Sequence, residues 1–140
     1  MILEASIFCL AINIYHEARS EPLAGQLAVG FSTMNRVADP RYPDTICGVV
    51  YDAKYNELSK HPIKHRCQYS WFCDGKSDQP TEEKALSRAT TLAKHIIEGS
   101  AGLDFTEGST HYHASYVSPD WSSPKYMTKI LTIGNHIFYR

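Results

Sequence analysis

The sequence predicts a helix-dominated α+β domain with a small antiparallel sheet. Three segments repeat apolar residues at spacings of three and four, which is the pattern of amphipathic helices. The final stretch reads instead as two short strands around a Gly-Asn turn. The chain of 140 residues has the length of one ordinary domain and contains no repeat, low-complexity tract or linker. We therefore expect one domain over residues 1–140.

The first helix, expected over residues 2 to about 20, carries an acidic residue on its apolar face. The stripe on this face consists of Leu3, Ile7, Leu10 and Ile14. Its next step falls on Glu17. A buried carboxylate is costly unless it is paired or its pKa rises until it is neutral, and a carboxyl group that stays protonated suits general-acid catalysis. The alternative is a carboxylate that pairs with Arg19, Arg36 or another cation.

Two further segments follow before the middle of the chain. A second amphipathic helix is expected over residues 22–38, because Pro22 suits a first helical turn and the apolar spacing continues. Its stripe consists of Leu23, Leu27, Gly30, Met34 and Val37. Gly30 indicates a close approach of two helices. A short helix over residues 45–51 is expected to be capped by Asp44 or Thr45.

The second half begins with polar sequence. Residues 52–66 are expected to form an exposed loop, and residues 67–72 a strand or an extended loop. A third helix is then predicted from a Thr81 cap to a stop at Gly99. Its apolar face consists of Ala85, Ala89, Leu92, Ala93, Ile96 and Ile97.

The sheet is expected near the carboxyl terminus. Residues 110–114 read as a short strand, and residues 129–139 read as a hairpin that turns at Gly134-Asn135. Turn geometry alone explains Asn135.

Composition excludes several classes of function. The net charge of -1, without a basic stripe, gives no indication of a nucleic-acid partner. No apolar run approaches the roughly 20 residues of a membrane span, so membrane insertion is not expected. Glu4 stands where a secretory signal would have basic residues. We expect a protein that is made in the cytoplasm without a signal peptide, unless a signal has been removed.

Four cysteines leave the redox state open. Cys9, Cys47, Cys67 and Cys73 allow two disulfides in three pairings, or four buried thiols. The spacing of the last two does not match a zinc knuckle.

Other polar residues are candidates for chemistry or binding. Glu21, four residues after Glu17, is either a second acid or a solvated charge. His16, His111 and His113 could form a three-histidine metal site, although no HExxH motif is present, or they could be groove or surface residues.

A polar and aromatic strip in the middle of the chain suits a sugar ligand. Gln68 and Ser70 could bond sugar hydroxyls, and Trp71 could stack on a pyranose ring. The alternative is a strand with one face in the core. No nucleophile elbow of the GxSxG type is present.

Several runs, taken together and in order, resemble the SleB/CwlJ-type cell wall hydrolases, which include the spore-cortex-lytic enzymes and phage or proteobacterial endolysin-like relatives. These runs are YHEARSEP at 15–22, GQLAV at 25–29, NRV at 35–37, YPDTICGVV at 42–50, CQYSW at 67–71, CDG at 73–75, THYH at 110–113 and IGNHIFY at 133–139. The resemblance covers almost the whole chain. One departure is Ser20, which stands where the family usually has Gly.

The resemblance implies a lysozyme-like catalytic domain that cleaves peptidoglycan glycan strands between N-acetylmuramic acid and N-acetylglucosamine as a lytic transglycosylase. The family's essential glutamate maps to Glu17, which would act as general acid and then base. Gln68, Ser70, Trp71, Tyr112 and His113 would hold the sugars. No cofactor or metal is expected, and the protein is expected to be a monomer that acts on the cell wall.

Three alternatives remain open at this point. The first is a hydrolytic muramidase that uses Glu17 and Glu21. The second is a metal-dependent amidase or peptidase built on the three histidines, and the third is a sugar-binding module without catalysis. The missing signal would suit a phage lysin released by a holin-like partner.

Overall fold

The computed structural model describes residues 2–140, with side chains from Leu3 onward. The helices are α1 (Ile2–Ala18), α2 (Leu23–Ala38), α3 (Ile46–Val50) and α4 (Glu83–Glu98), and the short 3-10 helices are η1 (Ser70–Cys73) and η2 (Asp120–Ser122). The strands are β1 (Ala53–Tyr55), β2 (Pro62–Cys67), β3 (His111–Ala114), β4 (Lys129–Ile133) and β5 (His136–Tyr139). No helix in this described part of the chain is long and apolar enough to cross a membrane.

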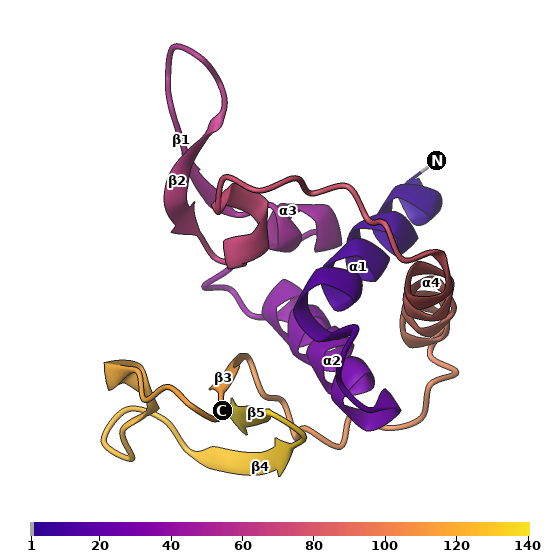
Figure 1. Cartoon of the computed structure of the whole chain (residues 1–140). Helices are drawn as coiled ribbons and strands as arrows, with labels where there is room; N and C mark the ends of the chain where they lie inside the picture. Colours follow the sequence, from indigo (N-terminus) through magenta and orange to yellow (C-terminus); the bar gives the residue numbers. More distant parts are fainter. Residues whose placement is uncertain (1) are drawn as a thin grey trace.

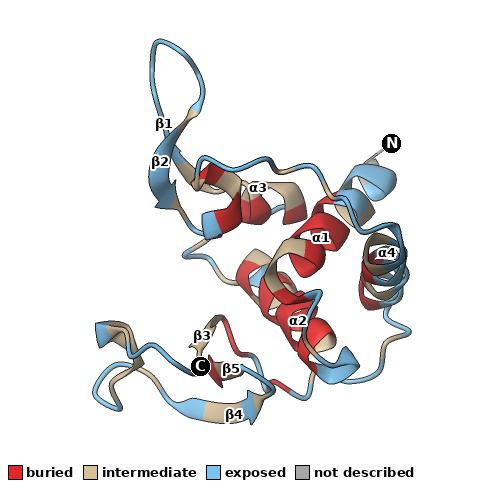
Figure 2. Cartoon of the chain, viewed as in Figure 1, coloured by how far each residue is buried: buried red, intermediate tan, exposed pale blue. Residues whose placement is uncertain are grey.

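Helix α1 is the centre of the helical part of the molecule. Helices α2, α3 and α4 all pack against it (Figure 1). Every residue from Cys9 to Tyr15 is buried, and Figure 2 shows this continuous buried stretch. The predicted one-sided stripe is therefore confirmed at Leu10 and Ile14 but wrong at Leu3, which is 55% exposed.

Helix α2 is buried over more of its circumference than the predicted stripe, whose members Leu27, Met34 and Val37 pack at the edge of the core. Leu23 is 55% exposed, and the other large members of the predicted stripe are only partly buried. The buried positions are Gly25, Gln26, Ala28, Val29, Gly30, Phe31, Ser32, Thr33 and Arg36. Several of the buried polar groups form hydrogen bonds: the Thr33 hydroxyl, for example, donates to the Val29 carbonyl at 2.8 Å, whereas the Ser32 hydroxyl has no partner.

The close approach predicted at Gly30 is confirmed. A Cβ atom at this position would lie 2.4 Å from Cδ1 of Ile96 on α4 and 3.2 Å from Cδ1 of Ile14 on α1. A larger residue here would force the Ile96 or Ile14 side chain to move, which favours glycine where α2 meets both helices.

The polar middle of the chain is more regular than expected. Strands β1 and β2 pair antiparallel and form a hairpin in place of the predicted loop over residues 52–66 (Figure 1). The predicted strand or extended loop over residues 67–72 is wrong at its end, because Ser70–Cys73 forms a 3-10 helix. Nearly all of the hairpin is exposed, so hydrophobic periodicity carries no signal for it.

The ends of α4 confirm one predicted signal and correct the other. Gly99 adopts a left-handed φ of 78° at the carboxyl end, as predicted. Thr81 is not the cap, because α4 begins at Glu83 and Glu82 occupies the cap position without a side-chain hydrogen bond.

The carboxyl-terminal sheet is antiparallel in the order β3-β5-β4, and the predicted hairpin at Gly134-Asn135 is confirmed. Phe138 on the central strand β5 is fully buried. Pairing of Tyr112 with Phe138 places the middle of β3 beside the core.

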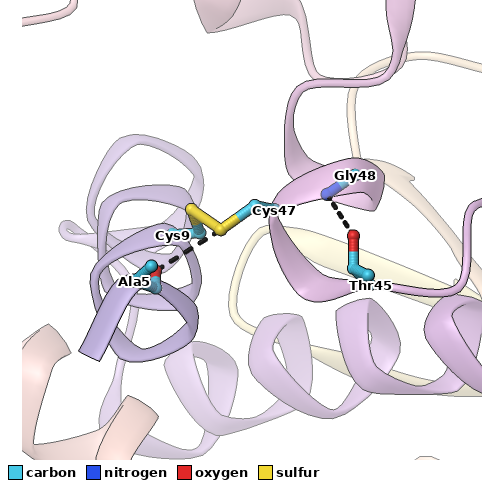
Figure 3. Close-up of a disulfide and its surroundings, with 5 residues drawn as sticks. All are labelled: Ala5, Cys9, Thr45, Cys47 and Gly48. Atoms are coloured by element: carbon cyan, nitrogen blue, oxygen red, sulfur yellow. Dashed lines mark hydrogen bonds between the residues drawn. A yellow bond between two sulfur atoms is a disulfide. The ribbon is translucent and has the colours of Figure 1, made fainter. Parts of the chain in front are cut away.

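All four cysteines are paired. One disulfide joins Cys9 on α1 to Cys47 on α3, and the other joins Cys67 at the end of β2 to Cys73 in η1. Figure 3 shows the first bridge beside the start of α3, where the Thr45 side chain accepts a hydrogen bond from the Gly48 amide at 3.0 Å. Thr45 is therefore the N-cap residue of α3, which confirms one of the two predicted caps.

Candidate active site

Glu17 lies in the last turn of α1, where the helix reaches the sheet. Its carboxyl group is partly buried and accepts a hydrogen bond from the Tyr112 hydroxyl on β3. Burial raises the pKa of Glu17, while the Tyr112 hydrogen bond and the positive charge of Arg36 oppose the rise. The inward direction predicted from the helical stripe is confirmed.

Tyr112 is fixed by the ring packing around it. Its ring centroid lies 5.3 Å from that of Phe138 and 5.1 Å from that of His136, both on β5. Burial, together with the neighbouring Glu17 carboxylate, raises the pKa of Tyr112 well above its ordinary value, so its hydroxyl keeps its proton. Tyr112 is therefore a permanent donor to Glu17.

Arg36 on α2 supplies positive charge to the site without forming an ion pair with Glu17. Its Nε donates to the Thr110 carbonyl at 2.7 Å, and its guanidinium lies 5.0 Å from the ring centroids of both Tyr42 and Tyr69. Within residues 2–140, no ion pair joins it to Glu17, and its buried Nη1 has no hydrogen-bond partner. The ion-pair alternative for Glu17 is thus wrong for Arg36; Arg19 pairs instead with Glu82.

A buried polar network lies beneath the site. The Trp71 indole donates to the Asn13 side-chain oxygen at 2.9 Å, and the Asn13 amide donates to Thr33 at 3.2 Å. The Thr33 and Tyr69 hydroxyls are 3.5 Å apart. The network ties α1, α2 and the segment before η1 together, which holds the residues around Glu17 in place.

The predicted sugar-binding strip divides into two parts. Gln68 and Ser70 are exposed. Trp71 is only 8% exposed and stacks on His16 with centroids 4.4 Å apart, so its ring is not an open platform for a pyranose. The prediction of an exposed aromatic face is wrong, because the indole nitrogen and the ring are both used in packing.

His113 belongs to a packed aromatic group on the sheet. Its Nδ1 donates to the Ala114 carbonyl at 2.7 Å, and its Nε2 lies 2.8 Å from the Tyr139 hydroxyl. Its ring stacks on Tyr139 and contacts Trp121 edge-on. Both ring nitrogens are therefore occupied: Nδ1 bonds within β3, and Nε2 joins β3 to β5 through Tyr139.

The proposed three-histidine metal site is not formed. His16 packs against Trp71 and contacts the Asp78 carbonyl, whereas His111 contacts Tyr42 and Trp121. Among residues 2–140, no group of three or more His, Cys, Asp or Glu side chains is arranged to hold a metal ion.

Glu21 is bound to the β4–β5 hairpin. One carboxylate oxygen accepts from the Asn135 amide at 2.8 Å and the other from the Asn135 side chain at 3.2 Å. Its side chain is 7% exposed, with His136 Nδ1 at 3.9 Å. The solvated-charge interpretation is therefore wrong for this residue, which anchors the turn, while the second-acid interpretation stays a prediction.

A groove lies beside the carboxyl end of α1, although Glu17 is not part of its lining. We call it the α1 groove; its lining is Tyr15, His16, Arg19, Trp71, Asp74, Lys76, Ser77, Gln79 and Thr81. The Tyr15 hydroxyl on its wall accepts from the Thr81 and Glu82 amides at 3.1 Å, which fixes the segment leading into α4.

With this geometry in hand, comparison with known proteins identifies the family. A sequence model described as Cell Wall Hydrolase matches residues 20–139. The chain belongs to the cell wall hydrolase family. The match begins three residues after Glu17, so it does not itself assign a role to that residue.

Curated relatives of this cell wall hydrolase are named spore cortex-lytic enzymes. The protein from Halalkalibacterium halodurans is 29% identical over 92% of this chain and 33% of its own length, and that from Bacillus subtilis is 27% identical over 92% and 35%. A Bacillus cereus relative is 26% identical over 92% and 42%. The chain thus spans about a third to two fifths of the length of these relatives.

Solved structures confirm the fold. The catalytic domain of Bacillus anthracis SleB, described as a germination-specific lytic transglycosylase, matches with a TM-score of 0.71 and 25% identity over 98% of this chain and 95% of that one. The Bacillus cereus SleB catalytic domain matches with a TM-score of 0.68 and 24% identity over 98% and 91%. The predicted lysozyme-like α+β class and the SleB/CwlJ-type resemblance are confirmed.

Two residues of the site were not recognised from the sequence as part of it. Tyr69 sits between the exposed Gln68 and Ser70, and the alternation of this run would have placed it inward. Arg36 was considered only as an ion-pair partner. Its two aromatic neighbours and its bond to Thr110 depend on tertiary packing.

Proposed function

We propose that this chain cleaves the glycan strands of peptidoglycan between N-acetylmuramic acid and N-acetylglucosamine by a lytic transglycosylase reaction. The observation that carries the proposal is the sheltered carboxyl group of Glu17. Burial raises the pKa of this group, and no cation among the described residues forms an ion pair with it. Membership of the cell wall hydrolase family supports the substrate, and similarity to the Bacillus anthracis SleB catalytic domain, a lytic transglycosylase, supports the reaction class.

In the first step, protonated Glu17 gives its proton to the glycosidic oxygen while the bond from that oxygen to C1 of the muramic residue breaks. Positive charge develops at C1. In the second step, the oxygen of the muramic 6-hydroxyl bonds to C1, and its proton passes to the Glu17 carboxylate. The products are a 1,6-anhydro end and a free sugar hydroxyl; no water is consumed, and Glu17 is protonated again.

Tyr112 and Arg36 support this exchange by limiting the rise of the pKa of Glu17. A residue that acts first as an acid and then as a base must be able to take both protonation states near the working pH. Burial favours the neutral form needed first, while the Tyr112 hydrogen bond and the Arg36 charge stabilise the carboxylate that exists between the two steps.

A single acidic residue suffices for this route because the nucleophile belongs to the substrate. Ordinary glycosidases require two flanking carboxyl groups. The engagement of Glu21 with Asn135 supports the one-acid route over a muramidase that uses both glutamates. Exposed Gln68 and Ser70 remain our candidates for contacts with the sugars.

Mass spectrometry of the soluble products from purified peptidoglycan tests the proposal. The wild type should release anhydro-muropeptides, and Glu17→Gln should lower the rate at least about 100-fold because the general acid is lost. Products that are heavier by one water would show hydrolysis instead. Wall binding without any release of sugars would indicate a binding module, and undiminished lysis by Glu17→Gln would remove Glu17 from the reaction.

A further inference from the structure

The β1–β2 hairpin is a cationic projection on a chain whose net charge is -1. It extends away from the helices and is almost entirely exposed, as Figure 2 shows. Between Ala53 and Cys67 it carries four Lys or Arg side chains and one Glu. Within residues 2–140 none of these four cations forms an ion pair, so their charges are available to an anionic partner.

A shallow groove lies along this projection, between β2 and the segment of η1 and the residues after it. We call it the hairpin groove; it is lined by His61, Pro62, Lys64, Phe72, Cys73, Gly75 and Lys76. Two lysines and a histidine line it without any acidic residue, and Pro62 and Phe72 add apolar surface. This combination suits a ligand that is both anionic and partly apolar.

Two contacts hold the segments that line the groove together. The Cys67–Cys73 disulfide joins the end of β2 to η1, and Cys73 is part of the lining. The stem of Lys64 lies over Gly75, where a Cβ atom would be 3.1 Å from the lysine Cε. A preformed groove loses less entropy when a ligand binds.

Lys76 connects the hairpin groove to the α1 groove, because it lines both. The α1 groove also contains His16, the residue before Glu17. A ligand in the hairpin groove would therefore lie near the side of the molecule where α1 ends.

We propose that the hairpin groove binds the acidic peptide stems that project from the muramic residues of peptidoglycan. Their carboxylates would pair with Lys64 and Lys76, and their aliphatic side chains would pack on Phe72 and Pro62. The apolar floor favours a peptide over a teichoic-acid phosphate chain, which has little apolar surface to bury. The inference rests on the proposed function, since it identifies the part of the same substrate that the hairpin contacts.

The test is a titration of the protein with the free peptide stem released from peptidoglycan by an amidase, followed by NMR of the backbone amides. Saturable shifts of the amides of His61, Ile63, Lys64 and residues 72–76 are expected at about millimolar peptide. The Lys64→Gln/Lys76→Gln protein should bind about three- to tenfold more weakly, which is the effect expected for two exposed ion pairs. Lys84→Gln/Lys94→Gln, with the same change of charge on exposed positions of α4, should bind like the wild type.

Three results would overturn the inference: no saturable shift, equal weakening in both double variants, or tighter binding of a glycerol-phosphate polymer than of the peptide. Methyl esters of the peptide should bind poorly, because their carboxylates are neutralised. Glu17→Gln should bind the stem like the wild type. Stem binding by a protein that releases no anhydro sugars would thus refute the proposed reaction and leave the groove assignment standing.

Discussion

Replacement of Glu21 by glutamine separates an anchoring role from a catalytic one. The carboxylate accepts hydrogen bonds from the amide and from the side chain of Asn135, at 2.8 and 3.2 Å. Glutamine keeps one oxygen as an acceptor but presents an NH₂ group to the other donor. It also removes the charge beside His136.

The size of the effect follows from these contacts. A hydrogen bond to a charged group contributes about 1.5–3 kcal/mol, so the loss of one bond and the weakening of the other should cost about 2 kcal/mol. For a domain of this length, that corresponds to a decrease in Tm of about 7 °C. The side chain is 7% exposed, so solvent screening removes little of the effect.

Thermal unfolding followed by circular dichroism, with both disulfides intact, measures the change. Wall-lysis rates at 25 °C should stay within about threefold of the wild type, because the variant remains folded at that temperature. Glu98→Gln is the matched control, since it removes an exposed carboxylate at the end of α4 and should leave Tm unchanged. An unchanged Tm with abolished lysis in Glu21→Gln would refute the anchoring role and revive a two-glutamate mechanism.

Two further predictions concern the site and the core. Tyr112→Phe removes a hydrogen bond that stabilises the Glu17 carboxylate, so the pKa of Glu17 should rise further. The alkaline decline of the pH–rate profile should then move to higher pH. A move to lower pH would contradict the assigned contact between Tyr112 and Glu17. Gly30→Ala should lower the free energy of unfolding by about 1–3 kcal/mol through overpacking against Ile96 Cδ1. Ile96→Val removes that atom, so the Gly30→Ala/Ile96→Val double variant should lose less free energy of unfolding than the sum of the two single losses, as measured by urea denaturation. Losses that simply add would argue against the contact.

The position of Glu17 could be predicted because it depends on local periodicity. A helix places residues three and four apart on one side, so the stripe through Leu10 and Ile14 also fixes the direction of Glu17. The turn at Gly134-Asn135 and the stop at Gly99 were found for a similar reason, since each depends on the backbone preferences of one or two residues.

The partners of Glu17 could not be derived from periodicity, because they come from distant segments. Tyr112 lies 95 residues away in the chain, and Arg36 is buried on a face of α2 that hydrophobic spacing does not mark. The family resemblance named Tyr112 as a sugar contact, whereas the structure shows it bonded to the acid. The β1–β2 hairpin was missed because backbone pairing forms it and few of its side chains are buried.

The protonation of Glu17 is the point on which the account depends. A carbon-13 NMR titration of the glutamate side-chain carboxyl groups, with Glu17→Gln to assign the signal, measures it directly. We expect the Glu17 signal to titrate above 4.5, its ordinary value, because burial outweighs the Tyr112 hydrogen bond and the Arg36 charge. A midpoint at or below 4.5 would show that the carboxyl group is already ionised when a glycan arrives, and Glu17 could not then be the proton donor.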